Sequence, residues 1–105
     1  QNLQQAVQVL SNGLTRNPSN AEIYNLRGTL HQSLDDPSSA TADWEASLRI
    51  DRRQFVIYAQ LFKIALDTGD RNSARIIIEQ GQQYLPNDPG WGPLIEVLKN
   101  RRRKK

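Results

Sequence analysis

The chain has 105 residues, with 14 lysines and arginines against 11 aspartates and glutamates, which gives a formal net charge of +3. This length allows one compact domain, and no apolar run is long enough for a membrane-spanning helix or framed like a secretory signal. The absence of cysteine excludes a disulfide framework, a thiolate nucleophile and a cysteine-ligated metal. It leaves the compartment open, with the cytoplasm favoured.

The excess of positive charge is confined to the C-terminal end of the sequence. Residues 99–105 carry six basic residues and no acidic one. The preceding residues, 1–98, therefore contain 8 basic and 11 acidic residues, a net charge of −3. We expect a mildly acidic body followed by a basic tail.

Small and large apolar residues recur at intervals of 34 along the chain. Alanine stands at positions 6, 40 and 74, a small residue at 13, 47 and 81, and a large apolar residue at 10, 44 and 78. Pro18 with Pro86 and Tyr24 with Tyr58 follow the same phase. Five registers that agree without an insertion or deletion predict an internal repeat.

Each period is predicted to contain two helices. The first helix of the first full period spans 21–34, where Ser19 and Glu22 have the spacing of a capping box. Its apolar residues recur at three- and four-residue steps, as one face of a helix requires: Ile23, Tyr24, Leu26, Leu30 and Leu34.

The second helix of this period is predicted over about 38–51, because Asp36 and Pro37 form an N-cap and a first helical residue. In the next period Gly69 and Asp70 act as helix stop and cap. Gly90, Gly92 and Pro93 around Trp91 predict a loop that leads into a last helix.

This 34-residue helix–turn–helix unit resembles the tetratricopeptide repeat. Residues 21–54 match its motif through Tyr24, Gly28, Ala40, Trp44 and Ser47, and residues 55–88 match it through Tyr58, Ala74, Ile78, Gly81 and Pro86. Residues 1–20 resemble the second helix of a preceding partial repeat, and residues 89–105 a C-terminal capping helix with a basic tail. The resemblance implies an all-α solenoid of antiparallel helix hairpins, with about six helices.

Three residues depart from the family pattern. Arg52 replaces the terminal proline, so Asp51 is expected to cap that helix. Phe62 stands where glycine or alanine is usual, which suggests a wider helix spacing in the second repeat. Arg27 replaces an inward leucine, and we expect its stem to pack while its head reaches solvent or an acid. A functional arginine in the groove is the alternative.

The array is short for this architecture, because a solenoid needs about three repeats for stability. A chain that opens with a second-type helix also lacks the partner helix that would cover Leu3, Val7 and Leu10. We expect either further repeats upstream or a homo-oligomer that forms through the N-terminal half repeat. The absence of methionine agrees with a processed form or a fragment of a larger protein.

The sequence gives little support for an enzyme. His31 is the only histidine, at a position that usually packs, so a core or boundary role is favoured over a catalytic base. Asp35 and Asp36 are adjacent in a turn, where one is expected to cap a helix and the other to be solvated. We expect no catalytic residues, no metal ligands and no cofactor.

By resemblance, the expected function is a protein–protein interaction module, an adaptor or scaffold that binds a peptide or a partner helix in a concave groove. The groove positions lie on the first helix of each repeat: Glu22, Asn25, Thr29, Gln32 and Ser33, then Val56, Ala59, Lys63, Leu66 and Asp67. The family's clamp for chaperone carboxylates is missing, because Asn25, Thr29 and Gln60 occupy its positions. An amphipathic or mostly neutral peptide would suit the groove, and the alternative is that these residues are only solvated.

The basic tail suggests a second kind of partner. Its charges could neutralise nucleic-acid phosphates or meet anionic lipid. The tail has no interleaved aromatic residue for base stacking, so a solvated end or a targeting signal is also open. The residues concerned are Lys99, Arg101, Arg102, Arg103, Lys104 and Lys105.

Overall fold

The computed structural model describes the backbone of residues 2–103 and the side chains of residues 2–100. Within this range the chain is all-α, and the prediction of about six helices is confirmed. The helices are α1 (Leu3–Arg16), α2 (Ala21–Ser33), α3 (Pro37–Ile50), α4 (Phe55–Asp67), α5 (Arg71–Tyr84) and α6 (Trp91–Arg103). None of these described helices has the length and apolar character that a bilayer crossing requires.

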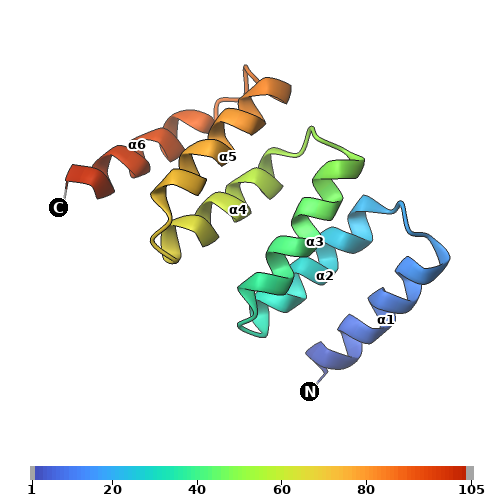
Figure 1. Cartoon of the computed structure of the whole chain (residues 1–105). Helices are drawn as coiled ribbons and strands as arrows, with labels where there is room; N and C mark the ends of the chain where they lie inside the picture. The colour runs from blue at the N-terminus through green and yellow to red at the C-terminus, as the bar shows by residue number, and fades with distance from the viewer. Residues whose placement is uncertain (1, 104–105) are drawn as a thin grey trace. The chain divides into compact units, whose positions relative to one another are not determined.

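The chain divides between Arg52 and Arg53 into two compact units of three helices each. In the first unit α2 packs against both α1 and α3, and in the second unit α5 packs against both α4 and α6. Figure 1 shows that neighbouring helices within each unit run antiparallel and are joined by short connections. Each unit is therefore built from consecutive helix hairpins.

The helix bounds recur along the chain. The first and last residues of α4 and α5 lie 34 positions after those of α2 and α3, and the bounds of α3 follow those of α1 by the same interval. The start of α6 departs from this spacing by two residues. The interval that the side-chain pattern indicated thus also appears in the lengths of helices and turns.

The turns before α3 and α5 use the same chemistry. The Asp36 carboxylate accepts a hydrogen bond from the Ser39 backbone N–H at 3.1 Å, and Asp70 accepts one from the Ser73 N–H at 3.0 Å. These bonds satisfy amides that have no partner within the helix. Gly69 has φ +82°, a conformation that glycine adopts without a steric penalty.

The start of α2 differs from the sequence prediction. Asn20, and not Ser19, is the N-cap, because its side chain accepts from the Ile23 N–H at 3.1 Å. Asn20 directly precedes the helix and has the extended backbone that an N-cap needs. At the other end of the first unit, Asp51 is the C-cap of α3 as expected.

The start of α6 also corrects the prediction, because Trp91 opens the helix and Gly92 and Pro93 lie within its first turn. Proline is tolerated there, since the first helical amides need no intrahelical acceptor. The Trp91 indole Nε1 donates to the Leu85 carbonyl at 2.7 Å, and the ring lies edge-on to Phe55 with centroids 4.8 Å apart. Only 3% of Trp91 is exposed, so this side chain fixes where the helix begins.

The core of each unit combines small and large side chains on facing helices. In the first unit Ala40 and Ser47 are fully buried beside Trp44. In the second unit Ala74 is fully buried, and the Trp91 ring occupies the space that a side chain at position 81 would need. Small residues let helices approach closely, and the large ones fill the remaining gap. The remaining buried apolar residues are Leu14 and Leu48, then Ile57, Tyr58, Leu61, Phe62, Ala65, Leu66 and Ile78.

The two hairpins differ in how tightly their helices pack. The backbones of α2 and α3 approach each other more extensively than those of α4 and α5. Gly28 lies on the α2 side of the first hairpin, whereas Phe62, 2% exposed, occupies the corresponding position in α4. A phenyl ring holds two backbones further apart than a hydrogen atom does, which agrees with the wider spacing expected for the second hairpin.

Candidate binding surfaces

A charged pair lies inside the first unit, between α2 and α3. The Arg27 guanidinium donates to both oxygens of Asp43, from Nε at 2.8 Å and from Nη2 at 2.6 Å. Only 4% of Asp43 is exposed, and 22% of the Arg27 side chain. This two-pronged geometry is the strongest form of an arginine–carboxylate contact. The sequence predicted that the Arg27 guanidinium contacts either solvent or an acidic residue, and the structure shows the contact with an acidic residue.

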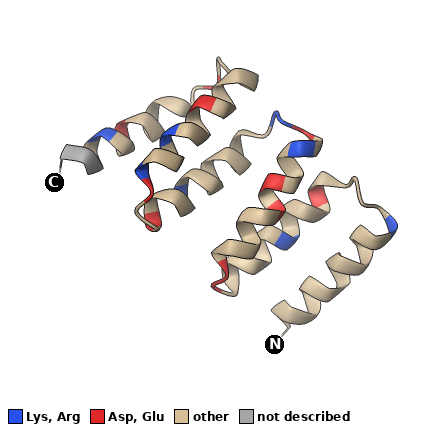
Figure 2. Cartoon of the chain, in the orientation of Figure 1, with Lys and Arg blue, Asp and Glu red and all other residues tan. Residues whose placement is uncertain are grey.

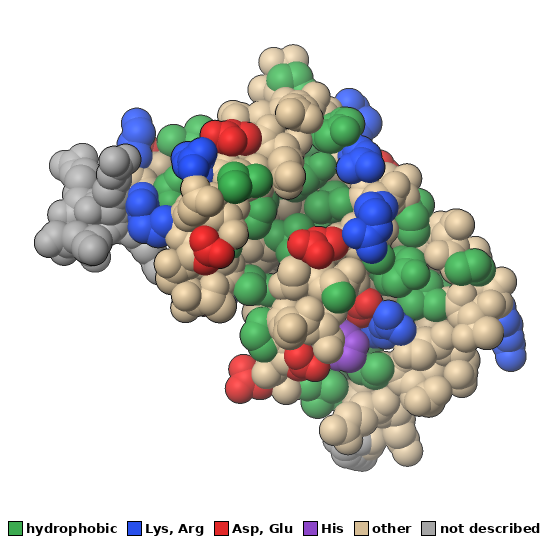
Figure 3. All heavy atoms as spheres, in the orientation of Figure 1, with side chains coloured by type: hydrophobic (Ala, Val, Ile, Leu, Met, Phe, Trp, Pro, Cys, Tyr) green, Lys and Arg blue, Asp and Glu red, His purple; other side chains and the backbone are tan. Residues whose placement is uncertain are grey.

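The pair extends to α1 and to the single histidine. Arg27 Nη1 donates to the Ser11 hydroxyl at 3.0 Å, and that hydroxyl donates to the Val7 carbonyl at 2.8 Å. His31 Nε2 lies 3.6 Å from Asp43, with 19% of its side chain exposed. Figure 3 shows the histidine at the surface beside basic and acidic side chains. The cluster thus joins all three helices of the unit.

This environment favours the charged form of Arg27 still further. Its hydrogen bonds to Asp43 raise the pKa of the guanidinium above its ordinary value, against the opposing effect of burial. Since both carboxylate oxygens already accept from Arg27, Asp43 is held as a structural partner of this charge. The cluster is best understood as a polar connection between helices.

The five groove positions expected on α2 are accessible to different degrees. Glu22, Thr29 and Ser33 are exposed, and Asn25 and Gln32 are half-buried. The Asn25 carbonyl accepts from the Thr29 hydroxyl at 3.1 Å and from the Trp44 indole at 3.4 Å. The Gln32 amide oxygen is buried and has no hydrogen-bond partner within the part of the chain that the structure describes.

The five positions expected on α4 divide into an exposed and a buried group. Val56 is 65% exposed, Lys63 and Asp67 are exposed and form a surface ion pair at 3.4 Å, and Ala59 is half-buried. Leu66 is only 7% exposed. Its side chain belongs to the packed interior, so it is not presented as a contact residue.

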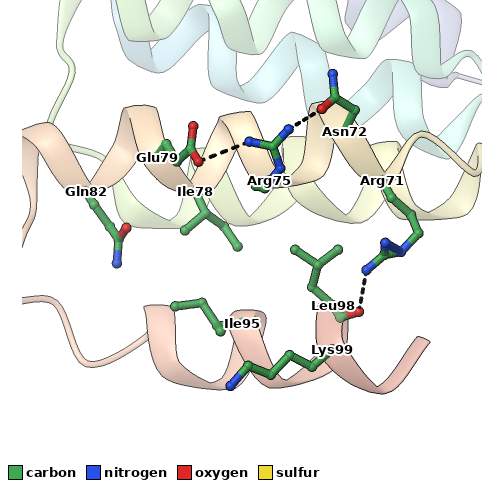
Figure 4. Close-up of a pocket in the computed structure, with 9 residues that line it drawn as sticks. All are labelled: Arg71, Asn72, Arg75, Ile78, Glu79, Gln82, Ile95, Leu98 and Lys99. Atoms are coloured by element: carbon green, nitrogen blue, oxygen red, sulfur yellow. Dashed lines mark hydrogen bonds and ion pairs between the residues drawn. The ribbon is translucent and has the colours of Figure 1, made fainter. Parts of the chain in front are cut away.

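A groove that was not anticipated lies between α5 and α6 in the second unit. It has a cavity volume of about 570 Å³, in the range of ordinary ligand pockets. Figure 4 shows Ile78 reaching from α5 towards α6 and Leu98 reaching back, with Arg71 and Arg75 along α5. Its lining consists of Arg71, Asn72, Arg75, Ile78, Glu79, Gln82, Ile95, Leu98 and Lys99.

The basic tail is described only in part. Lys99 is exposed and lies 4.0 Å from Glu96, and the backbone of residues 101–103 continues α6. The side chains of Arg101, Arg102 and Arg103, and the whole of Lys104 and Lys105, lie outside the described residues.

The surface of α1 contrasts with these charged regions. Arg16 is its only charged residue, as the near absence of colour on this helix in Figure 2 illustrates. Val9 is 67% exposed and Leu3 39% exposed, whereas Val7 and Leu10 are half-buried. The helix therefore carries scattered apolar side chains on a neutral surface.

The sequence pattern assigned Ile78 to the repeat motif and Lys99 to the basic tail, and it did not predict that the two residues line one groove. A signal existed in the α6 sequence, where Trp91, Ile95 and Leu98 are spaced as one helical face and Lys99 follows directly. Within the part of the chain that the structure describes, no group of three or more histidine, aspartate or glutamate side chains is placed to hold a metal ion.

No protein-family model and no curated protein matches the chain.

Proposed function

We propose that the chain is a tetratricopeptide-type module that binds an extended peptide or a partner helix, as an adaptor or as part of a larger scaffold. One observation carries the proposal: the bounds of α2 and α3 recur in α4 and α5 after 34 residues. Helix hairpins repeated at a fixed interval characterise arrays whose role is to present binding surfaces. The activity proposed is binding and not catalysis.

The exposed side chains of the first helices support this proposal. On α2, the exposed side chains of Thr29 and Ser33 offer uncharged hydrogen-bonding groups. On α4, Val56 offers exposed apolar area, and the exposed Lys63 lies seven positions further along the same helix. These surfaces suit an amphipathic or mostly neutral peptide.

Selection from a phage-displayed library of random peptides, with the full chain as bait, tests the proposal. Peptides that are enriched would then be measured by fluorescence anisotropy against two double variants, Glu22→Lys/Thr29→Lys on α2 and Val56→Asp/Lys63→Glu on α4. We expect at least one double variant to weaken binding about tenfold. All four positions are exposed, so the fold should tolerate the changes.

The matched control is Gln80→Lys/Gln83→Lys, which places two charges on exposed positions of α5. This variant should bind the selected peptides as the unmodified chain does. The proposal is wrong if no peptide is enriched, or if the α2 and α4 variants bind the selected peptides with unchanged affinity.

Self-association is a second candidate function, favoured by the exposed Val9 and Leu3 on the nearly uncharged α1. Apolar side chains on such a surface are covered in many oligomers. Sedimentation equilibrium should then detect a dimer that Leu3→Asp/Val9→Asp disrupts. A monomer at all accessible concentrations contradicts this candidate and leaves the peptide-binding proposal intact.

A further inference from the structure

The groove between α5 and α6 has an apolar floor. Ile78 is 5% exposed, and Ile95 and Leu98 are half-buried and approach from the opposite helix. In Figure 4 these three side chains lie between the two helices. The floor can therefore accept one or two aliphatic side chains from a partner without rearrangement of the helices.

The rim of the groove is basic, in contrast to the acidic body of the chain. Arg71, Arg75 and Lys99 lie around it, and Glu79 is the one acidic residue among its described lining residues. On the face drawn in Figure 3, basic and acidic side chains both lie over α5 and α6, with hydrophobic side chains exposed among them. Lys99 is also the first residue of the C-terminal run of six basic residues.

Several donors on this rim are unused or weakly engaged. Arg71 Nη2 donates to the Leu98 carbonyl at 2.8 Å, but its Nε is buried and has no hydrogen-bond partner among the described residues. Arg75 is held by Asn72 and by an exposed ion pair with Glu79 at 3.2 Å. Lys99 Nζ lies 4.0 Å from Glu96 Oε2, with 64% of the Lys99 side chain exposed. Exposed pairs of this kind exchange readily for a better acceptor.

We propose that the α5–α6 groove binds an acidic, amphipathic peptide segment of a partner protein. Aliphatic side chains of the segment enter between Ile78, Ile95 and Leu98, and its carboxylates meet Arg71, Arg75 and Lys99. The charge of the rim is the argument for an acidic occupant, because complementary charge selects the partner and speeds its association. This site lies on other helices than the α2 and α4 surfaces and does not depend on the function proposed above.

The same observations favour a peptide over the other anionic partners. None of the described lining residues is an aromatic on which the base of a single-stranded nucleic acid could stack. A membrane surface would need the apolar face of α6 to be free. Trp91 is buried, and Ile95 and Leu98 face α5, so these side chains line a recess that a peptide side chain can enter and do not protrude from α6 towards a bilayer.

The test is fluorescence anisotropy of the full chain with a labelled probe peptide of about twelve residues, with leucine at every third or fourth position and aspartate or glutamate elsewhere. Two further probes keep the length: one with lysine in place of the acids, and one with serine in place of the leucines. We expect saturable binding of the acidic, leucine-containing peptide, weaker with added salt, and about tenfold weaker binding of either altered peptide.

The decisive variant is Arg75→Glu/Lys99→Glu, which reverses two exposed charges of the rim. Its matched control is Arg16→Glu/Arg49→Glu, which makes the same change in net charge at exposed positions of α1 and α3. We expect the rim variant to lose affinity for the acidic probe about tenfold or more and the control to keep it, with both folded by circular dichroism.

Three results would overturn the proposal: no binding of the acidic probe, equal loss of affinity in both double variants, or tighter binding of a single-stranded oligonucleotide or of phosphatidylserine vesicles to the same rim. The α4 variant Val56→Asp/Lys63→Glu should leave binding of the acidic probe unchanged. Weaker binding of the acidic probe by this α4 variant would assign the peptide to the α4 surface and not to this groove. The proposal for the α5–α6 groove and the proposal for the α2 and α4 surfaces can therefore fail separately.

Discussion

The indole of Trp44 on α3 lies directly against the backbone of Gly28 on α2. A methyl group added to Gly28 would come within 2.6 Å of the indole Nε1. The same Nε1 is 3.4 Å from the Asn25 carbonyl, so the ring is held in place from two sides. The close approach of α2 and α3 therefore depends on the absence of a side chain at position 28.

Substitution of Gly28 by alanine should lower the free energy of unfolding by about 1–3 kcal/mol, because a rigid ring or the helix itself must move. The better helix propensity of alanine offsets part of this cost. Urea unfolding followed by far-UV circular dichroism measures the effect. Gly92→Ala is the control, since a side chain there meets open space and should stabilise α6 by about 0.5 kcal/mol. Equal effects of the two substitutions would contradict the packing argument.

Removal of Asp43 should be costly, because it leaves the largely buried Arg27 without its acid. We expect the single variant Asp43→Leu to destabilise the chain by about 3 kcal/mol. The double variant Arg27→Leu/Asp43→Leu removes both charges and should recover more than half of that loss. A double-mutant cycle by urea unfolding measures the coupling, and additive single effects would count against the pair.

The caps of α3 and α5 predict a dependence of stability on acid. Hydrogen bonds from the side chain and backbone of Ser39 lower the pKa of Asp36, and those of Ser73 lower the pKa of Asp70. A carboxyl whose pKa is lower in the folded chain stabilises it above the unfolded value of about 3.9, and this contribution is lost as the pH falls through the folded pKa.

Asp36→Asn/Asp70→Asn should test this, because asparagine also caps a helix but does not titrate. The loss of stability between neutral pH and about pH 3 should be smaller in the double variant than in the unmodified chain. Thermal unfolding at several pH values measures this difference. An identical pH profile would exclude the two caps as its source.

Trp91 should dominate the stability of the second unit. Trp91→Ala empties a site lined by Phe55 and Tyr58 and should cost about 3–5 kcal/mol. Trp91→Phe keeps most of the packing but removes the 2.7 Å bond to the Leu85 carbonyl, and should cost about 1–2 kcal/mol. Chemical unfolding of both variants gives the ranking. A phenylalanine variant as unstable as the alanine variant would show that the hydrogen bond, and not ring packing, holds α6.

The sequence by itself determined the local structure. Apolar spacing placed the helices, Asp36, Asp70 and Gly69 marked the turns between them, and the 34-residue interval anticipated the recurrence of the helix bounds. These features depend on residues a few positions apart, which interact through one helix turn or one cap. Length and charge indicated a small chain that is mildly acidic over residues 1–98 and basic over residues 99–105. They did not indicate the division into two compact units.

Tertiary structure alone decided which distant residues meet. Arg27 pairs with Asp43 sixteen positions away, and Trp91 packs against Phe55 in the second unit. Leu66, which the sequence predicted as a contact residue of the groove, is buried. The groove between α5 and α6 likewise exists only because two helices bring separate apolar and basic residues to one place. Such pairings depend on how the helices rotate and pack against one another. A periodic sequence pattern predicts which face of a helix is buried, but it does not predict which residues of another helix that face contacts.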